Sequence, residues 1–368
     1  MNDSQIAFTN IDAEYERNVK LFPEMLKYYD FIKERIIHNQ SYVQYSTTTK
    51  AFWSIHDHVN NIIYDRTARH ARLKQDRTKT DKNFDSNYLM MKELFSKHYM
   101  IRVKISNVLD LCCAPGGFAR ALLEIFPDLM IQGVTLPFEF HSGIPCLFHH
   151  KQFKVIYQDV ILLARDKFEI IMRTLGSYVE KLEWRLNSFV QYQPVFDCAI
   201  LDGAYVGDTI EIDENHFRKV VIANMNLRFS ELMLAVLTLK YNGFLILRAS
   251  TKAYNFIAPF IWLILQKHFK HVEFFSASQT STKGMWPHSF VYIVYKNFKL
   301  QALEANKLAL YLQKILFQFD ENKFTFFEDI LVPTLLEENF FSKIKLLYAE
   351  EHEHVKENLE KLKSKYNL

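Results

Sequence analysis

The sequence has little glycine and no long apolar run. Nine of its 368 residues are glycine, against roughly 7% in an average protein, and all nine lie between positions 116 and 284. Because glycine is used where the backbone turns sharply or approaches a ligand closely, we expect the functional site in this central stretch. The longest apolar run, 256–265, has ten residues and contains a proline, so it is too short to span a membrane.

Cysteine is also scarce, and its spacing excludes two common roles. The four cysteines show no CxxC spacing, and we therefore expect neither a zinc site nor a disulfide framework. The histidines of the clusters at 56–58 and 352–354 stand two residues apart, which places them on different sides of a helix, so we expect no metal site. The first ten residues contain no basic or apolar block, which indicates an intracellular protein of the cytoplasm or nucleus and not a secreted one.

Net charge of one sign is nearly absent. Forty-five Lys and Arg balance 42 Asp and Glu, and 49% of the residues are hydrophobic, which is typical of a soluble globular protein without a general field for nucleic acid or membrane. The exception is the basic segment, residues 65–82, with seven Lys or Arg and three Asp. It is either a solvated helix face or linker, or a segment that contacts RNA.

Short apolar or β-branched runs alternate with helical stretches in the middle of the chain, which predicts an α/β fold with a mostly parallel, doubly wound sheet. The loop between the last two strands is too short for a crossover helix, so we expect that pair to be antiparallel. The predicted strands span 105–110, 130–135, 154–157, 197–202, 244–248, 271–275 and 290–295, and the predicted helices between them span 118–126, 165–189, 227–241 and 254–269.

The clearest chemical signal is VLDLCCAPGGFARALL at 108–123. An apolar strand ends near Asp110, a loop with Pro115, Gly116 and Gly117 follows, and an amphipathic helix begins. Adjacent glycines let the backbone approach a ligand, and a helix start offers unpaired N–H groups. Asp110 is placed to receive a cationic or hydrogen-bond-donating group. The pattern is neither a P-loop nor the GxGxxG of dinucleotide folds; a tight turn without a ligand is the alternative.

The stretch DLCCAPGGF resembles motif I of S-adenosylmethionine-dependent methyltransferases. Its Ala-Pro-Gly-Gly-aromatic form resembles the FtsJ/RrmJ-like ribose 2′-O-methyltransferases, in a divergent branch of fungal type indicated by GVTLP (133–137) and HSFVYIVYKNF (288–298). The resemblance implies a Rossmann-like class I methyltransferase fold, a seven-stranded sheet with helices on both faces, over residues 86–299. Residues 1–85, with the basic segment, and 300–368 are then helical extensions.

The resemblance also implies S-adenosyl-L-methionine as cofactor. Ligands of open α/β sheets bind beyond the carboxyl ends of the strands, and the predicted strands end at or near Asp110, Thr135, Asp159, Asp202 and Arg248. By resemblance, Thr135 meets the ribose, where an acidic residue is usual and Glu139 could substitute, and Asp159 lies by the adenine. Asp202 is a further cofactor contact. The residues expected to hold the methionine portion are Asp110, Cys112, Cys113, Ala114, Pro115, Gly116, Gly117 and Phe118.

The same family typically carries a Lys-Asp-Lys-Glu tetrad for catalysis. Lys92 matches the first lysine and Asp202 the aspartate, but Arg248 and Phe290 stand where the second lysine and the glutamate are expected. Arginine does not lose its proton in proteins, and phenylalanine carries no charge. The alternatives are that Lys92 is solvated, that Asp202 with Gly203 forms a turn, and that Arg248 pairs with Asp202 instead of contacting substrate.

These features predict a methyltransferase that acts on RNA, at a ribose 2′-oxygen, with Lys92, Asp202 and Arg248 as catalytic residues. One alternative is a catalytically impaired protein of this fold that binds cofactor or RNA. Another is methylation of a protein or small molecule, against which stand the resemblance and the basic segment. We expect RNA and no membrane as partner; the sequence indicates no oligomeric state.

Overall fold

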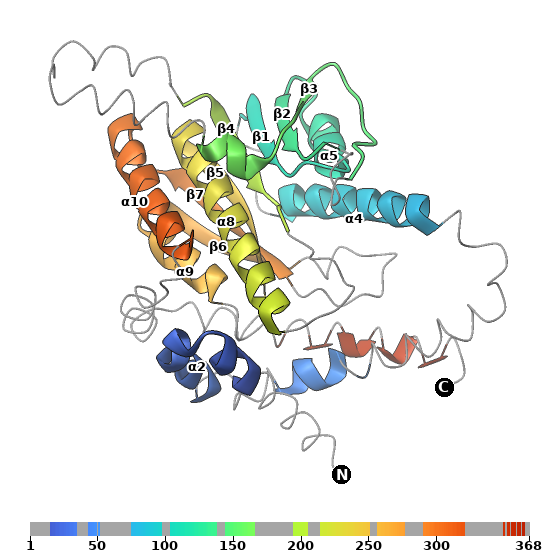
Figure 1. The fold of residues 1–368 in the computed structure, drawn as a ribbon. Coiled ribbons are helices and arrows are strands. Elements are labelled where there is room, and N and C mark those ends of the chain that lie inside the picture. The colour runs from blue at the N-terminus through green and yellow to red at the C-terminus, as the bar shows by residue number, and fades with distance from the viewer. Residues whose placement is uncertain are drawn as a thin grey trace, which may run out of the picture.

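The structure is a computed structural model that describes residues 15–34, 43–49, 51, 75–97, 104–137, 144–165, 194–204, 214–250, 256–276 and 290–320, together with 349, 352, 353, 355–357, 359–361, 363 and 364. Figure 1 shows its elements in chain order. They are η1 (Pro23–Met25), α2 (Leu26–Ile32), α4 (Gln75–Lys97), β1 (Asn107–Leu111), α5 (Gly117–Ile125), β2 (Met130–Thr135), β3 (Phe153–Tyr157), β4 (Phe196–Leu201), α8 (Glu214–Thr238), β5 (Leu239–Ser250), α9 (Ile257–Gln266), β6 (Phe269–Ser276), β7 (Phe290–Phe298) and α10 (Ala302–Asp320).

One seven-stranded sheet organises the chain, in the order β3-β2-β1-β4-β5-β7-β6. The first five strands in that order are parallel, and β7 runs antiparallel to both β5 and β6. The predicted α/β fold is confirmed, including the antiparallel last pair. The strand order reverses beside β1, where β1 pairs with β2 on one side and β4 on the other, and ligands of such sheets bind at this place.

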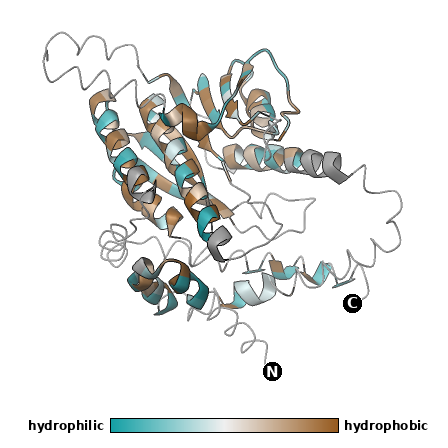
Figure 2. Ribbon diagram, in the orientation of Figure 1, coloured by the Kyte–Doolittle hydropathy of each residue, from teal (hydrophilic) through white to brown (hydrophobic). Residues whose placement is uncertain are grey.

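Helices cover both faces of the sheet (Figure 1). Helices α8, α9 and α10 pack with α2 on one face and form the larger core, while α4 and α5 form a second core on the other. Alternate residues of β5 supply both cores: Leu245 and Leu247 belong to the larger core, and Phe244 and Ile246 belong to the second, as the period of two in a strand requires. A sheet buried on both faces reads as continuous apolar runs, and Figure 2 draws its strands mostly in the brown of apolar residues.

Several predicted boundaries move. Helix α8 begins at Glu214 and ends at Thr238, earlier at both ends than the predicted helix 227–241, and β5 begins at Leu239. The residues 160–165 are helical, before the predicted start of the 165–189 helix, whose remainder lies outside the described residues. Helix α4 includes 75–82 of the basic segment and continues to Lys97, so it runs through the predicted domain boundary after residue 85.

Segments from both ends of the chain complete the core on the α8 face. Tyr28 and Tyr29 of α2 are buried, and Phe256, next to α9, meets the rings of Phe22 and Tyr28 edge-on. Near the other end, Val355 is buried in the same core. The terminal segments therefore add to the hydrophobic core of the sheet domain.

Helix α8 contains a 21-residue stretch, Arg218–Thr238, that is long and apolar enough to cross a membrane. It is not a continuous apolar run, because polar residues interrupt it. In the structure 56% of its most apolar window is buried, and the helix packs between the sheet and α10. Core helices of soluble proteins meet the same criterion, so this is weak evidence for a membrane span.

Candidate functional site

Asp202, Arg248 and Tyr292 lie next to one another in one row across the carboxyl edge of the sheet. Leu201 of β4, which precedes Asp202, is in register with Leu247, which precedes Arg248. Arg248 is in turn in register with Tyr292 of β7. Neighbouring strands lie about 4.8 Å apart, so β4, β5 and the antiparallel β7 bring these polar side chains together. The structure thus unites Asp202 and Arg248, as predicted.

Side chains in and beside this row form the strand-end cluster, Asp202, Arg248, Phe290 and Tyr292. The Tyr292 hydroxyl donates a hydrogen bond of 2.7 Å to Oδ1 of Asp202, and Nη1 of Arg248 lies 3.9 Å from the same oxygen. The guanidinium carbon of Arg248 lies 4.0 Å from the centroid of the Phe290 ring. Phe118, at the start of α5, meets Tyr292 edge-on, which places the cluster beside the glycine-rich loop.

Asp110 lies on the same face of the sheet, two residues before that row. It is in register with Ile200, two residues before Asp202, and side chains two apart share a face. Asp110 is 0% exposed, and neither carboxylate oxygen has a hydrogen-bond partner among the described residues. Burial, followed by the charges of Asp202 and Glu231, raises its pKa well above the usual value. A buried carboxylate of this kind calls for a cationic or hydrogen-bond-donating ligand.

The loop after β1 has the backbone of a ligand-binding turn. Cys112 has a φ of 61° and Gly116 a φ of 99°, a left-handed conformation in which glycine avoids the strain of a Cβ. Gly116 caps α5 without any side-chain hydrogen bond, so the helix start keeps N–H groups of the type that bind anions. A Cβ on Gly117 would lie 2.3 Å from the carbonyl oxygen of Phe84, so this second glycine serves the packing of α4 on α5.

The groups around β1 suit the charges of S-adenosylmethionine, the cofactor that the family resemblance implies. Its amino acid portion carries an ammonium and a carboxylate; the orphaned Asp110 carboxylate suits the first, and the uncapped start of α5 suits the second. Among the described residues, no group of three His, Cys, Asp or Glu is arranged to hold a metal ion.

A buried ion pair on α8 supports the end of β4 from the other side. Glu231 is 0% exposed; it accepts hydrogen bonds from the Gly203 N–H at 2.9 Å and from Arg228 at 3.0 Å. Arg228 also donates to the Leu201 carbonyl. A Cβ at Gly203 would lie 2.7 Å from Glu231 Oε1 and 2.9 Å from Cys112 Sγ. Gly203 thus allows the close approach of these groups.

Thr135 is the last residue of β2, and Asp159 lies two residues beyond the end of β3, as expected. Thr135 is buried, and its carbonyl oxygen accepts from the Gln158 N–H at 2.9 Å. Oδ1 of Asp159 accepts from the Ile161 N–H at 2.7 Å, which caps the helical residues 160–165. Asp159 thus has a structural role beside any contact with adenine. Glu139 lies outside the described residues.

The segment 144–150, between β2 and β3, lies over the glycine-rich loop. The Leu147 N–H donates to the Pro115 carbonyl at 2.9 Å. A Cβ on Gly116 would lie 3.0 Å from Cβ of Phe148 and 3.2 Å from Sγ of Cys146. Cys113 is buried beneath, and its N–H donates to the carbonyl of Val134. The loop is therefore held in place by β2 and by this segment.

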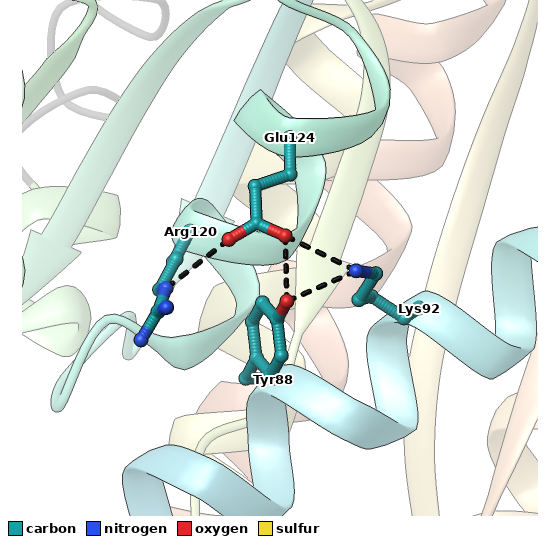
Figure 3. Close-up of polar contacts among 4 residues, drawn as sticks. All are labelled: Tyr88, Lys92, Arg120 and Glu124. Carbon is teal, nitrogen blue, oxygen red and sulfur yellow. Dashed lines mark hydrogen bonds and ion pairs between the residues drawn. The ribbon is translucent and has the colours of Figure 1, made fainter.

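Lys92 does not join the strand-end cluster. Its Nζ lies 3.0 Å from the Tyr88 hydroxyl and 3.1 Å from Oε2 of Glu124, and the other carboxylate oxygen, Oε1, accepts from Arg120. Figure 3 shows these four residues, which we call the helix-surface cluster. Hydrogen bonds from Lys92 to Tyr88 and Glu124 raise the pKa of Lys92, whereas a lysine that acts as a base needs a lowered pKa.

The position of this cluster along α5 explains the separation. The start of α5, Gly117, touches Phe84 and Tyr88 of α4, and Lys92 meets Glu124 near the other end of α5. Seven residues of helix correspond to roughly 10 Å. The sequence predicts that Lys92 lies with Asp202 and Arg248. In the structure the described contacts of Lys92 include neither residue, because Glu124 holds its ammonium.

Sequence reasoning missed three residues of this region: Glu231, Arg228 and Tyr292. The sequence carries a signal for the first two, since Arg228 and Glu231 are the only charged residues between positions 220 and 238 of this helix, and such charges are buried only when paired. Tyr292 gives no comparable signal, because aromatic residues are common in strands.

Comparison with known proteins gives the following. A model of the FtsJ-like methyltransferase family matches residues 89–298, more than half of the chain. No curated protein matches the sequence. Among solved structures, a protein described as a ribosomal RNA methyltransferase from Plasmodium falciparum is 16% identical, with a TM-score of 0.37 over 57% of this chain and 94% of its own. Human methyltransferase-like protein 13, solved with S-adenosylhomocysteine, is 14% identical, with a TM-score of 0.32 over 64% and 90%.

Proposed function

Because the chain belongs to the FtsJ-like methyltransferase family, and is thus an S-adenosylmethionine-dependent methyltransferase, we propose that its acceptor is RNA and that the methyl group is placed on a ribose 2′-oxygen. The observation that carries the proposal is the row of polar side chains at the carboxyl edge of the sheet. Asp110 is buried without a partner, and Asp202 lies two residues further along the sheet, on the same face and next to the glycine-rich loop.

The residues divide into a cofactor side and an acceptor side. We assign Asp110 and the loop 112–118 to the methionine portion of the cofactor, and Thr135 and Asp159 to its adenosine portion. When bound, the cofactor supplies an electrophilic methyl group on a sulfonium. Asp202, which adjoins both the cofactor side and the acceptor side, is assigned to the acceptor hydroxyl.

Asp202 is the group of the strand-end cluster that can accept the proton of a hydroxyl. Tyr292 donates to its Oδ1 and so fixes the carboxylate. Arg248 keeps its proton under all ordinary conditions, so it acts as a fixed positive charge and not as a base. Orienting a hydroxyl and assisting its proton are the contributions that this transfer requires of the protein.

The basic segment supports RNA as the acceptor. Its residues 75–82 begin α4, the helix whose later turns pack on α5 beside the site. We propose that the segment binds the RNA backbone, which predicts binding that weakens as salt is added. Neutralising Arg77, Lys79 and Lys82 together should lower RNA affinity; unchanged affinity would contradict this role.

The test of the proposed function is transfer of a labelled methyl group. The purified full chain is incubated with methyl-labelled S-adenosylmethionine and total RNA, the RNA is digested to nucleosides, and cofactor binding is measured on the same preparation by calorimetry. We expect label in 2′-O-methylnucleosides. Label on a base or on protein would contradict the acceptor, and bound cofactor without any transfer would favour the impaired, non-catalytic alternative.

A further inference from the structure

Arg248 is a cation at the carboxyl edge of the sheet whose hydrogen-bonding capacity is unused. Its side chain is 29% exposed, and its nearest carboxylate oxygen, Oδ1 of Asp202, is 3.9 Å away, beyond hydrogen-bond distance. Within the part of the chain that the structure describes, no hydrogen bond to the Arg248 guanidinium is present. A guanidinium offers five N–H donors, and none of those of Arg248 is used by a described residue.

The other arginines near this region differ in that respect. Arg228 donates to the Leu201 carbonyl and to Glu231, and Arg120 donates to Glu124 at 3.2 Å. Both therefore have a structural task within the fold. Arg248 has instead a loose ion pair and an aromatic neighbour, which hold the charge in place without using its donors.

Phe290 orients this guanidinium. The guanidinium carbon lies 4.0 Å from the centre of the Phe290 ring, a distance at which a cation is attracted to the ring face. Phe290 begins β7 and Arg248 pairs with Tyr292 two residues later, so both positions are fixed by the sheet. A carboxylate at position 290 would compete for the N–H groups of Arg248, whereas a phenyl ring leaves them free for a ligand.

The geometry points to a phosphate-binding site: we propose that Arg248, held against Phe290, binds a backbone phosphate of the acceptor RNA and thereby positions the hydroxyl that meets Asp202. This inference rests on the proposed function, which it deepens. The planar fork of an arginine matches two phosphate oxygens. A free nucleotide offers the same phosphate chemistry, so the experiment has to separate the two sources.

The test measures binding of a labelled single-stranded RNA of mixed sequence by fluorescence anisotropy, over salt concentrations from about 50 to 200 mM. Arg248→Gln should weaken binding about 10-fold and reduce the magnitude of the slope of log K against log salt by about 0.7, as expected for one lost phosphate contact on a single strand. Arg120→Gln is the matched control, because Arg120 also lies over an aromatic ring and beside a carboxylate. If both variants show the same slope, the inference is overturned.

Two further variants keep the test informative if Arg248→Gln does not fold. Arg248→Lys keeps the charge and should retain the salt slope while binding more weakly. Phe290→Glu should weaken RNA binding with a reduced slope, because the new carboxylate pairs with Arg248. RNA affinity and slope unchanged in folded Phe290→Glu would contradict the inference.

Competition identifies the source of the phosphate. A nucleoside 5′-monophosphate that displaces the RNA, where the nucleoside alone does not, would assign the site to free nucleotides and overturn the RNA assignment; no displacement would support it. The outcome is separable from that of the proposed function. Methyl transfer by a wild-type protein with an Arg248-independent slope overturns only the inference, and an Arg248-dependent slope without transfer overturns only the proposed function.

Discussion

Two arginines of this protein, Arg120 and Arg248, each lie over an aromatic ring and beside a carboxylate. They differ in whether that carboxylate accepts a hydrogen bond from the arginine. In the helix-surface cluster, Arg120 lies 4.8 Å from the Tyr88 ring centre, and Glu124 accepts hydrogen bonds from Tyr88, Lys92 and Arg120. In the strand-end cluster, Arg248 lies 4.0 Å from the Phe290 ring centre, and its carboxylate neighbour is 3.9 Å away.

The difference separates a structural contact from a binding site. In the helix-surface cluster the tyrosine, the lysine and the arginine each donate a hydrogen bond to Glu124, and the four residues link α4 to α5 on an exposed surface (Figure 3). The strand-end cluster and the neighbouring Asp110 keep unused donors and acceptors in a buried or half-buried place. Buried polar groups without partners are costly, and a fold retains them where a ligand completes them.

The largest expected effect is on turnover. Asp202→Asn keeps the shape of the side chain and an acceptor for Tyr292 but removes the charge that takes the hydroxyl proton. We expect the rate of methyl transfer to fall by about 10²- to 10⁴-fold, with cofactor affinity much less affected. Glu124→Gln, the matching change in the helix-surface cluster, should stay near the wild-type rate. Equal losses in the two variants would remove the distinction between the clusters.

The second effect is on folding stability, and it compares two arginine–glutamate pairs of α8 and α5. Arg228→Met leaves Glu231 buried without its ion-pair partner, which typically costs about 3–5 kcal/mol. Arg120→Met removes a pair whose side chains are 44% and 40% exposed, and exposed pairs contribute less than about 1 kcal/mol. Urea unfolding of both variants measures the two values.

The Arg228→Met loss should also depend on pH. Burial raises the pKa of Glu231 in the folded state, and the Arg228 charge opposes that rise, so the variant has a still higher folded-state pKa. A raised pKa favours the folded state below about pH 4.5 and disfavours it as pH rises. The destabilisation should therefore shrink on acidification; a loss that is constant with pH would show that Glu231 is not the cause.

Third, Asp110→Asn should weaken cofactor binding by about 10- to 100-fold, since a hydrogen bond to a charged group contributes about 1.5–3 kcal/mol. The same change should raise the melting temperature of the ligand-free protein at pH 7. Burial raises the pKa of Asp110, so its ionisation destabilises the fold as pH rises above 3.8, and the difference should vanish at lower pH. Calorimetry with S-adenosylmethionine and melting curves at pH 7 and below pH 4 check both parts. Unaltered cofactor affinity would contradict the assignment.

The smallest effect concerns Lys92. Because its ammonium is held by exposed Glu124 and Tyr88, Lys92→Met and Glu124→Gln should each change stability only slightly, and the change should decline with salt. The two variants should also differ little in turnover. A far larger loss of methyl transfer in Lys92→Met would restore the catalytic role that the family resemblance implies for this lysine.

Much of the fold could be read from the sequence, because apolar strands alternate with helices along the chain. The sequence misplaces the helix–strand junction at 238–239, because the continuous apolar run of β5 begins only after Gly243 and the extended residues 239–242 are not part of such a run. Contacts between distant segments are the part that was missed: the capture of Lys92 by Glu124, 32 residues away, and the Tyr292–Asp202 bond, 90 residues away.

The site, like the fold, could be predicted where local pattern decides and not where contacts between distant segments decide. Asp110, Asp202 and Arg248 could be placed at one edge because strand ends share an edge in a parallel sheet. The buried pair beneath Gly203 could not, since a helix residue such as Glu231 reaches that edge only through the packing of α8 on β4. Local pattern predicts which element carries a side chain, and tertiary packing decides which partner it meets.

The most direct test of the account is a crystal structure of the full chain with S-adenosylhomocysteine, the product form of the cofactor. The account predicts that the amino group of the ligand lies within hydrogen-bond distance of Asp110, with Asp202 and Arg248 facing the open acceptor side and the helix-surface cluster unchanged from Figure 3. A ligand bound elsewhere, with both Asp110 oxygens still unpartnered, would contradict it.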